Sequence, residues 1–178
     1  MTITLRLPVA VYLAARQHLL PARSRLEQGG FLLAQFNDGG GNVAFDYMDW
    51  MPLKAEDYEM QHQDYLELTD VARARVIKHA HDMEACLVEL HSHPRPYPAA
   101  FSPSDMHGIE EFVPHVRWRL KGRPYAAVVV APSGFDALAW VGAVKAPVQL
   151  HAIETDTEIL RATELTLMRR QAVSHGAI

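Results

Sequence analysis

Two histidines and one acidic residue, His91, His93 and Asp105, have the types and spacing of metal ligands. The histidines follow a short apolar run, residues 85–90, which predicts a buried strand. Because residues i and i+2 of an extended chain project to the same face, both imidazoles can reach one ion while Ser92 points away. Asp105 follows a stiff, proline-rich loop and lies in the first turn of a predicted helix, so it can return to the strand end.

Two imidazoles and a carboxylate suit zinc, because catalytic zinc has three protein ligands and leaves its fourth position to water. Such a metal lowers the pKa of bound water and polarises a substrate carbonyl. The reaction also needs a proton acceptor, and Glu27, just before a predicted strand, has the placement of a general base. In the alternative interpretation the histidines are a surface coincidence, Ser102 and Asp105 only cap a helix, and Glu27 is a surface acid before a Gly-Gly turn.

The pattern His91-Ser-His-Pro, a short spacer and then Ser102-x-x-Asp105 resembles the motif of the JAMM (MPN+) zinc metalloproteases. Upstream, Arg25–Leu33 resembles that family's glutamate followed by a strand of small and apolar residues. The resemblance covers about residues 25–141, so both ends of the chain are weakly covered.

The resemblance also implies a role for each residue of the motif. The implied roles are zinc ligation by His91, His93 and Asp105, acid/base catalysis by Glu27, and stabilisation of the oxyanion by Ser102. One feature departs from the family pattern, because eight residues, Pro94–Phe101, separate His93 from Ser102 where the usual number is seven. We interpret this difference as a one-residue insertion in the proline-rich loop.

These roles describe the hydrolysis of an amide or isopeptide bond. The resemblance implies ubiquitin or a ubiquitin-like protein as the substrate and partner, joined through a C-terminal glycine to a lysine or to an extension. Two alternatives stay open: a non-catalytic MPN scaffold, and a peptidase that processes a sulfur-carrier protein of ubiquitin-like fold. A DNA-repair-associated relative has little support, because the chain lacks a basic stripe.

Length and composition fit one soluble globular domain over residues 1–178. The net charge of −4 comes from 21 acidic against 17 basic residues, and the basic residues are scattered, so we expect no nucleic-acid partner. The single cysteine, Cys86, excludes an intrachain disulfide and is compatible with a reducing compartment. Neither a signal-peptide pattern nor an apolar run long enough to span a membrane occurs, so we expect a cytoplasmic protein.

Alternation of apolar runs and turn signals predicts an α/β fold. The resemblance implies a single JAMM/MPN-like domain with a curved, mainly antiparallel sheet flanked by helices. Strands are expected over residues 2–7, 31–36, 43–50, 64–68, 85–90, 125–130, 135–141 and 148–153, and helices over 8–20, 70–83, 103–114 and 158–173. We expect Pro114 to end or kink its helix, and Lys54–Gln63 to be an exposed loop, a plain connection or one that contacts substrate.

A second His-x-His pair, His79 and His81, falls within a predicted helix. Side chains two apart on a helix diverge, so we exclude this pair from the site. His107, on the helix that begins near Asp105, is either an outer partner of the site or part of a solvated helix surface.

Overall fold

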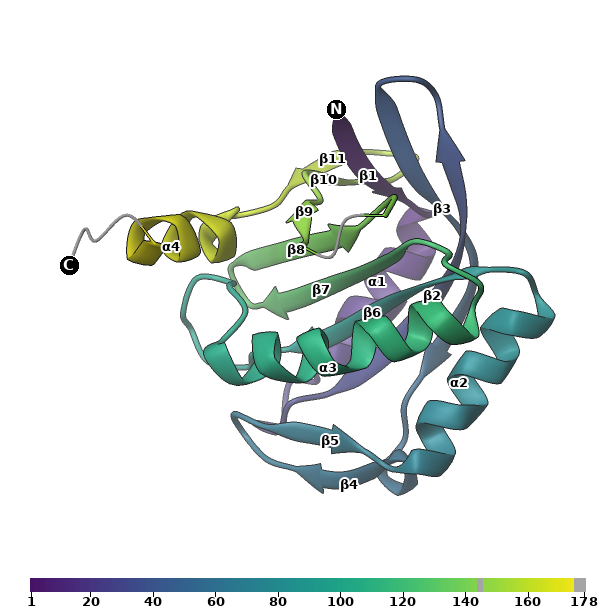
Figure 1. Cartoon of the computed structure of the whole chain (residues 1–178). Coiled ribbons are helices and arrows are strands. Elements are labelled where there is room, and N and C mark those ends of the chain that lie inside the picture. The colour runs from purple at the N-terminus through teal and green to yellow at the C-terminus, as the bar shows by residue number, and fades with distance from the viewer. Residues whose placement is uncertain (144–145, 175–178) are drawn as a thin grey trace.

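A sheet of nine strands runs through the computed structural model, which describes residues 1–143 and 146–174 (Figure 1). Its strands are β1 (Thr2–Arg6), β2 (Gly29–Asp38), β3 (Asn42–Pro52), β6 (Cys86–Ser92), β7 (Tyr125–Ala131), β8 (Gly134–Trp140), β9 (Val148–Gln149), β10 (Ala152–Glu154) and β11 (Ile159–Arg161). Their order is β11-β10-β1-β3-β2-β6-β7-β8-β9. Three neighbouring pairs, β1 with β10, β1 with β3, and β6 with β7, are parallel, and the others are antiparallel.

The sheet curls because two short strands near its opposite ends are almost consecutive in the chain. Leu150 and His151 alone separate β9 from β10. The Leu150 amide donates to Ala137 O at 3.1 Å on one side, and the His151 amide donates to Ile3 O at 2.8 Å on the other. The ends of the sheet therefore approach each other.

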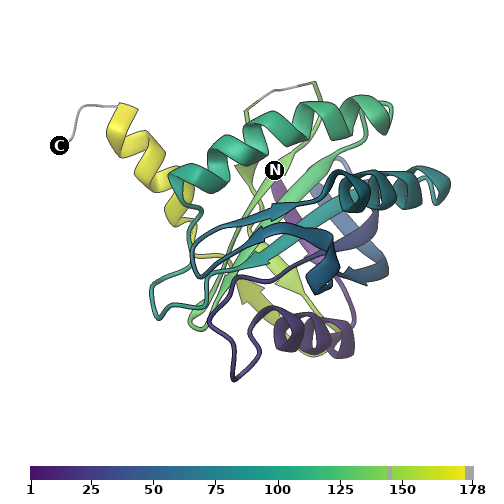
Figure 2. The same ribbon diagram turned by 90° about the horizontal axis from the view of Figure 1, so that it is seen from below.

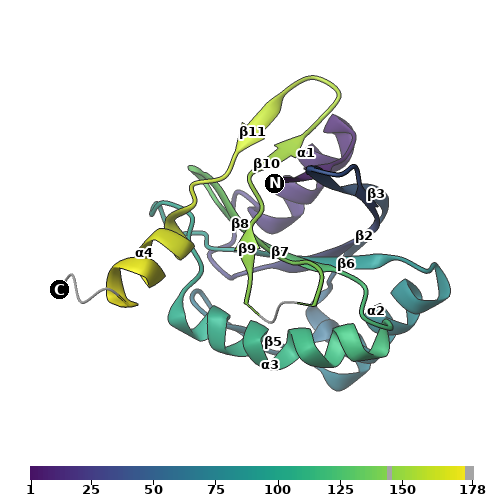
Figure 3. The same cartoon turned by 45° about the horizontal axis from the view of Figure 1, so that its top comes forward.

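Helices cover both faces of the curled sheet. Figures 2 and 3 show α1 (Val9–Leu19) on one face, and α2 (Asp70–Asp82) and α3 (Pro103–Arg119) on the other. Along β7 the residues alternate between two apolar clusters: Ala126, Val128 and Val130 pack on the α1 side, and Tyr125, Ala127 and Val129 pack on the α3 side. A strand buried on both faces reads as a continuous apolar run, which is why the sequence predicts the central strands.

Two smaller units complete the fold. A 3₁₀ turn, η1 (Ala55–Asp57), leads into a separate hairpin of β4 (Tyr58–Gln61) and β5 (Leu66–Leu68). At the other end of the chain, α4 (Leu165–Ser174) begins beside the N-terminal end of α3 (Figure 1). An ion pair joins these two helices, with Arg170 Nη2 at 2.9 Å from Glu110 Oε1.

The expected mixed α/β class with a curled, mainly antiparallel sheet is confirmed. The segment Lys54–Gln63 is largely exposed, as expected, but the expected loop is wrong, because the segment contains η1 and β4. Apolar periodicity could not predict this structure, because a polar contact holds it. Asp57 is buried and lies against Arg75, with Arg75 Nη1 2.9 Å from Asp57 Oδ1. Pro114 does not end α3, because it is exposed and the apolar face continues beyond it to Val116.

The C-terminal boundaries also differ from the expected ones. The strand expected over 148–153 is divided into β9 and β10, because the chain changes partner strands there. The helix expected over 158–173 begins only at Leu165, because Ile159–Arg161 pairs with β10 and Glu164 has a positive φ of 59°. In the part of the chain that the structure describes, no helix is long and apolar enough to cross a membrane.

Candidate metal centre

The end of β6 presents two imidazoles. His91 pairs with Gly29 of β2 and with Val129 of β7, so the strand is held on both sides at the site. His93 directly follows the strand, and its amide donates to Val130 O at 2.8 Å, which keeps the chain extended as far as the second histidine. The two rings lie in contact, with centroids 5.1 Å apart, as the i, i+2 spacing predicts.

The first turn of α3 brings Asp105 to these rings. Ser102 caps the helix: its Oγ accepts from the Asp105 amide at 3.1 Å, while the Ser102 amide donates to Asp105 Oδ2 at 2.6 Å. The loop before the cap ends in three buried residues, Ala99, Ala100 and Phe101. Asp105 is thereby fixed at both its backbone and its carboxylate.

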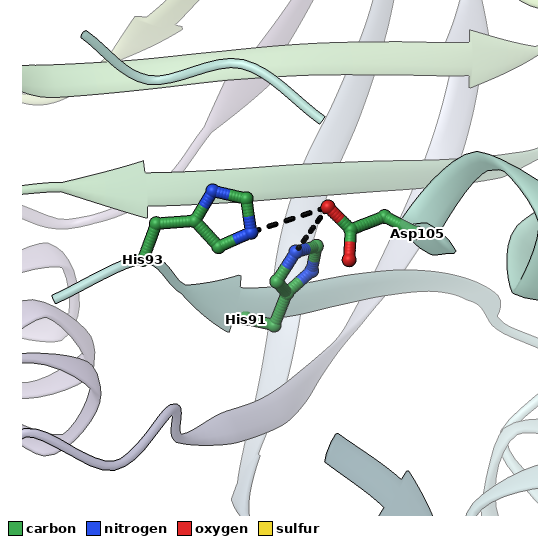
Figure 4. A group of neighbouring side chains, drawn as sticks. All are labelled: His91, His93 and Asp105. Carbon is green, nitrogen blue, oxygen red and sulfur yellow. Dashed lines mark ion pairs between the residues drawn. The ribbon is translucent and has the colours of Figure 1, made fainter. Parts of the chain in front are cut away.

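Figure 4 shows the three side chains facing one point. Asp105 Oδ2 lies 3.1 Å from His93 Nε2 and 3.6 Å from His91 Nε2. One ligand atom from each residue lies within 4.8 Å of the others, so the group could hold a metal ion. His91 Nε2 is buried and has no hydrogen-bond partner among the described residues, which is costly for a polar atom unless a ligand binds it.

The charges around the histidines favour a cation. Burial works against the charged form of His91, but the carboxylates of Asp105, Glu89 and Glu27 outweigh it and raise the pKa of His91 to about 9. Burial also works against the charge of Asp105, yet His91 and His93 hold the pKa of this carboxyl well below its usual range. Positive charge is therefore stabilised between the imidazoles and the carboxylates, and this donor set fits zinc.

Glu27 reaches the same site from the segment before β2. Its Oε1 lies 3.6 Å from His93 Nε2, and the residue is only 3% exposed, so the alternative of a surface acid is wrong. Burial raises the pKa of Glu27, although His91 and His93 partly offset this effect. A buried carboxyl with a raised pKa, beside a candidate metal site, is suited to both accepting and donating a proton.

The Gly-Gly pair that follows Glu27 and Gln28 leaves space for neighbouring side chains. Neither glycine has a positive φ. A Cβ at Gly30 would lie 2.2 Å from the ring of Trp50, so a side chain there would displace Trp50. The absence of a side chain at Gly30 therefore serves packing and not a special backbone conformation.

Several hydrogen bonds that hold the segment around Glu27 in place were not predicted from the sequence. Ser92, between the two histidines, accepts from the Gln28 amide at 2.9 Å, while its own amide donates to Gln28 O at 2.9 Å. From the β4–β5 hairpin, Gln61 Nε2 donates to Glu27 O at 2.8 Å. These contacts hold the segment that carries the carboxylate against the end of β6.

Glu89 is a further acidic residue that the sequence analysis did not select. It lies two positions before His91 on β6 and accepts a hydrogen bond from the Tyr125 hydroxyl. Burial raises the pKa of Glu89, and its charge acts on His91. The two-residue periodicity of a strand could have revealed Glu89, because it places residues 89, 91 and 93 on one face.

A cavity of about 1010 Å³ lies beside the site, between β5, α2 and α3. Its lining includes His91, Asp105, Glu89, Arg73 and Phe112. Apolar side chains and two of the candidate ligands therefore face the same cavity. A chain segment or side chain bound in this cavity would contact the metal centre directly.

The remaining candidates are not members of the ligand group, although His81 and His107 line the cavity beside it. His79 Nε2 pairs with Asp49 Oδ2 at 3.0 Å, consistent with excluding the second His-x-His pair. His107 is exposed and lies 3.6 Å from Glu111 on the same helix. Cys86 is buried, and burial raises the pKa of its thiol to about 11, so it is suited to packing and not to reaction.

Comparison with known proteins adds no further assignment: no protein-family model matches the chain, and no curated protein has a significantly similar sequence.

Proposed function

We propose that the chain is a zinc peptidase of the JAMM type, which hydrolyses the bond between the C-terminal glycine of a ubiquitin-like protein and a lysine or a chain extension. The proposal is supported by one observation above all: His91, His93 and Asp105 face a single point, and the Glu27 carboxylate lies 3.6 Å from His93. A helix-capping pair or a surface histidine pair needs no such convergence. The residues that resemble the JAMM motif in sequence are also those that meet in space.

His91, His93 and Asp105 would hold the zinc. When bound, zinc supplies a Lewis acid that polarises the substrate carbonyl and makes water more acidic. Glu27 accepts a proton from the attacking water and later returns it to the leaving amine. Its burial beside the site favours this exchange, because a raised pKa makes the protonated form accessible during turnover.

Ser102 stabilises the oxyanion in this proposal. Its Oγ accepts the Asp105 amide hydrogen, but the hydroxyl hydrogen is left to donate to a substrate oxygen. The capping role and the catalytic role are therefore compatible. The cap also fixes the direction of the side chain before substrate binds, as an oxyanion donor requires.

Substitution Glu27→Gln tests the proposed mechanism, because it preserves the size of the side chain but removes the proton acceptor. We expect the variant to fold and to retain zinc, while kcat for a ubiquitin-like substrate falls by about 10²- to 10⁴-fold with little change in substrate affinity. Loss of zinc from the variant would instead make Glu27 a ligand. Turnover equal to that of the parent would contradict the mechanism.

A panel of three substrates separates the possible activities. It contains an isopeptide-linked conjugate, a linear fusion of a ubiquitin-like protein, and a sulfur-carrier precursor with a C-terminal extension. Cleavage of the conjugate supports the isopeptidase, and cleavage of the precursor alone supports the processing peptidase. A parent protein that carries zinc but cleaves none of the three would favour the non-catalytic scaffold.

A further inference from the structure

The segment before α4 and the first turn of α4 are bound to the loop that leads into the metal centre. Thr163 Oγ1 donates to Ala99 O at 2.6 Å, and Thr166 Oγ1 accepts from the Phe101 amide at 2.9 Å. The partners are separated by 64 and 65 residues in the chain. In Figure 3 this segment and the start of α3 lie at the same end of the sheet.

A buried carboxylate fixes Thr166 in turn. Asp136, on β8, has 0% exposure, and its Oδ2 accepts from the Thr166 hydroxyl at 2.6 Å and from the Thr166 amide at 2.9 Å. Its Oδ1 accepts from the Ala137 amide at 2.9 Å and from Gln149 Nε2 at 3.2 Å. Because the Thr166 hydroxyl hydrogen is committed to Asp136, the oxygen lone pairs are directed to Phe101.

Phe101 connects this network with the ligands in two ways. Its ring packs edge-on against His91, with centroids 5.6 Å apart, and the residue is 5% exposed. The next residue, Ser102, caps α3 and donates its amide hydrogen to Asp105. The position of one backbone amide therefore bears on the orientation of His91 and on the position of Asp105.

We infer that Thr166, held by Asp136, is a positioning residue for the metal centre. It fixes the end of the loop Pro94–Phe101, which is one residue longer than in the family pattern, so that His91 and Asp105 face one ion. The inference rests on the proposed metal binding but not on the proposed substrate. If Thr166 served stability alone, loss of its hydrogen bonds would lower the free energy of unfolding without changing how the metal is held.

The variants Thr166→Val and Thr166→Ser separate these roles. Valine preserves the volume but removes the acceptor for Phe101 and the donor to Asp136, whereas serine retains both. We expect the Kd for Zn²⁺, measured by competition with a chelator, to rise about 10- to 100-fold in Thr166→Val, as for other groups that orient metal ligands. The visible absorption spectrum of the Co²⁺-loaded variant should also shift, and Thr166→Ser should restore both parental values.

Thr69→Val is the matched control, because it also removes a hydroxyl that accepts from an amide, that of Ala72 at 3.1 Å, but Thr69 caps α2. It should destabilise the fold while leaving the Zn²⁺ affinity and the Co²⁺ spectrum at parental values. If Thr166→Val keeps the parental Zn²⁺ affinity and the parental Co²⁺ spectrum, this inference is overturned while the proposed function is unaffected. A parent protein that binds neither ion would overturn the inference and the proposed function together.

Thr163→Val provides a second test if Thr166→Val does not fold. It removes the bond to Ala99 O without leaving a buried amide unpaired, so a smaller loss of Zn²⁺ affinity is expected. Affinity and Co²⁺ spectrum equal to those of the parent would then contradict the inference.

Discussion

Asp105 illustrates how one residue can satisfy a local and a distant requirement at once. Its carboxylate accepts from the amide of Ser102, which completes the helix cap, and the same oxygen faces both histidines. The capping interpretation and the metal interpretation of the Ser-x-x-Asp pattern are therefore not alternatives. A capped first turn is a rigid base for a ligand, because the backbone and the side chain are fixed by the same pair of bonds.

Ser102→Ala should reduce turnover by roughly 10²-fold or more, as expected for loss of an oxyanion donor, while zinc is retained. It also removes a helix cap, which costs about 1 kcal/mol of stability. Thr69→Ala is the control, because it removes the cap of α2 and should leave turnover unchanged. Parental turnover in Ser102→Ala, measured at saturating substrate, would show that another group stabilises the oxyanion.

Ser92→Ala should lower kcat without loss of zinc. The variant loses the bond from the Gln28 amide to Ser92 Oγ, so the segment that carries Glu27 is held less firmly against β6. The stability cost should be about 0.5 to 1.5 kcal/mol, the net value of one hydrogen bond. Steady-state kinetics, zinc analysis and urea unfolding measure the three effects, and unchanged kcat with reduced stability would confine Ser92 to a structural role.

At the scale of elements, the ligand-bearing parts of the chain could be predicted and their supports could not. The strand β6 begins with an apolar run that is interrupted only by Glu89, and the start of α3 carries a serine cap followed by proline. The supports depend on hydrogen bonds between residues far apart, such as Gln61 with Glu27, 34 residues away, and Thr166 with Phe101, 65 residues away. Such pairs produce no local periodicity or spacing in the sequence from which they could be predicted.

The turn η1 and the strand β4 show the same limit, whereas β5 falls within the strand expected over residues 64–68. The sequence of η1 and β4 is polar, so apolar periodicity could not reveal them, and their order depends on an ion pair in which only the acidic partner is buried. Asp57 is held by the Arg75 guanidinium and accepts from the Lys54 amide at 2.9 Å. The hydrogen bond with Arg75 is the main reason that the pKa of Asp57 lies below its usual value of 3.8.

Asp57→Asn should reduce the free energy of unfolding by about 2 kcal/mol, the scale of a hydrogen bond to a charged group. Because the folded state lowers the pKa of Asp57, the contribution is fully present above about pH 4 and is lost as the pH falls through the folded-state pKa. Urea unfolding of parent and variant at several pH values should give a constant difference near neutrality that narrows only in acid.

Glu56→Gln is the control for this pair, since Glu56 is the exposed neighbour and its loss should change stability little. A difference between parent and Asp57→Asn that stays constant through the acid range would refute the role of the Asp57 charge.

At the scale of the whole molecule, the curled sheet brings the site together. Strands β2 and β7 hold β6 from both sides, and α3 crosses the face on which the candidate ligands lie (Figure 1). The mixed class could be expected from the alternation of apolar runs and turn signals, and the mainly antiparallel sheet from the resemblance to the JAMM motif. The closure through β9 and β10 could not, because it depends on where two- and three-residue strands find partners.

Zinc should stabilise the folded chain, because the three candidate ligands are assembled only there. At a free zinc concentration of 100 times Kd, the gain is about 2.7 kcal/mol. For a domain of this length the corresponding rise in Tm is roughly 5 to 10 °C. Thermal unfolding with and without a chelator measures the shift, and the same shift in His93→Ala would show that zinc binds elsewhere.

Zinc content is the most direct test of the metal centre, which is the central claim. Elemental analysis of the purified protein after exposure to zinc and removal of the excess should give about one zinc per chain, and His93→Ala should abolish or severely reduce this content. His107→Ala, which removes an exposed histidine outside the ligand group, should retain the parental content. Full zinc content in His93→Ala, or none in the parent, would contradict the account.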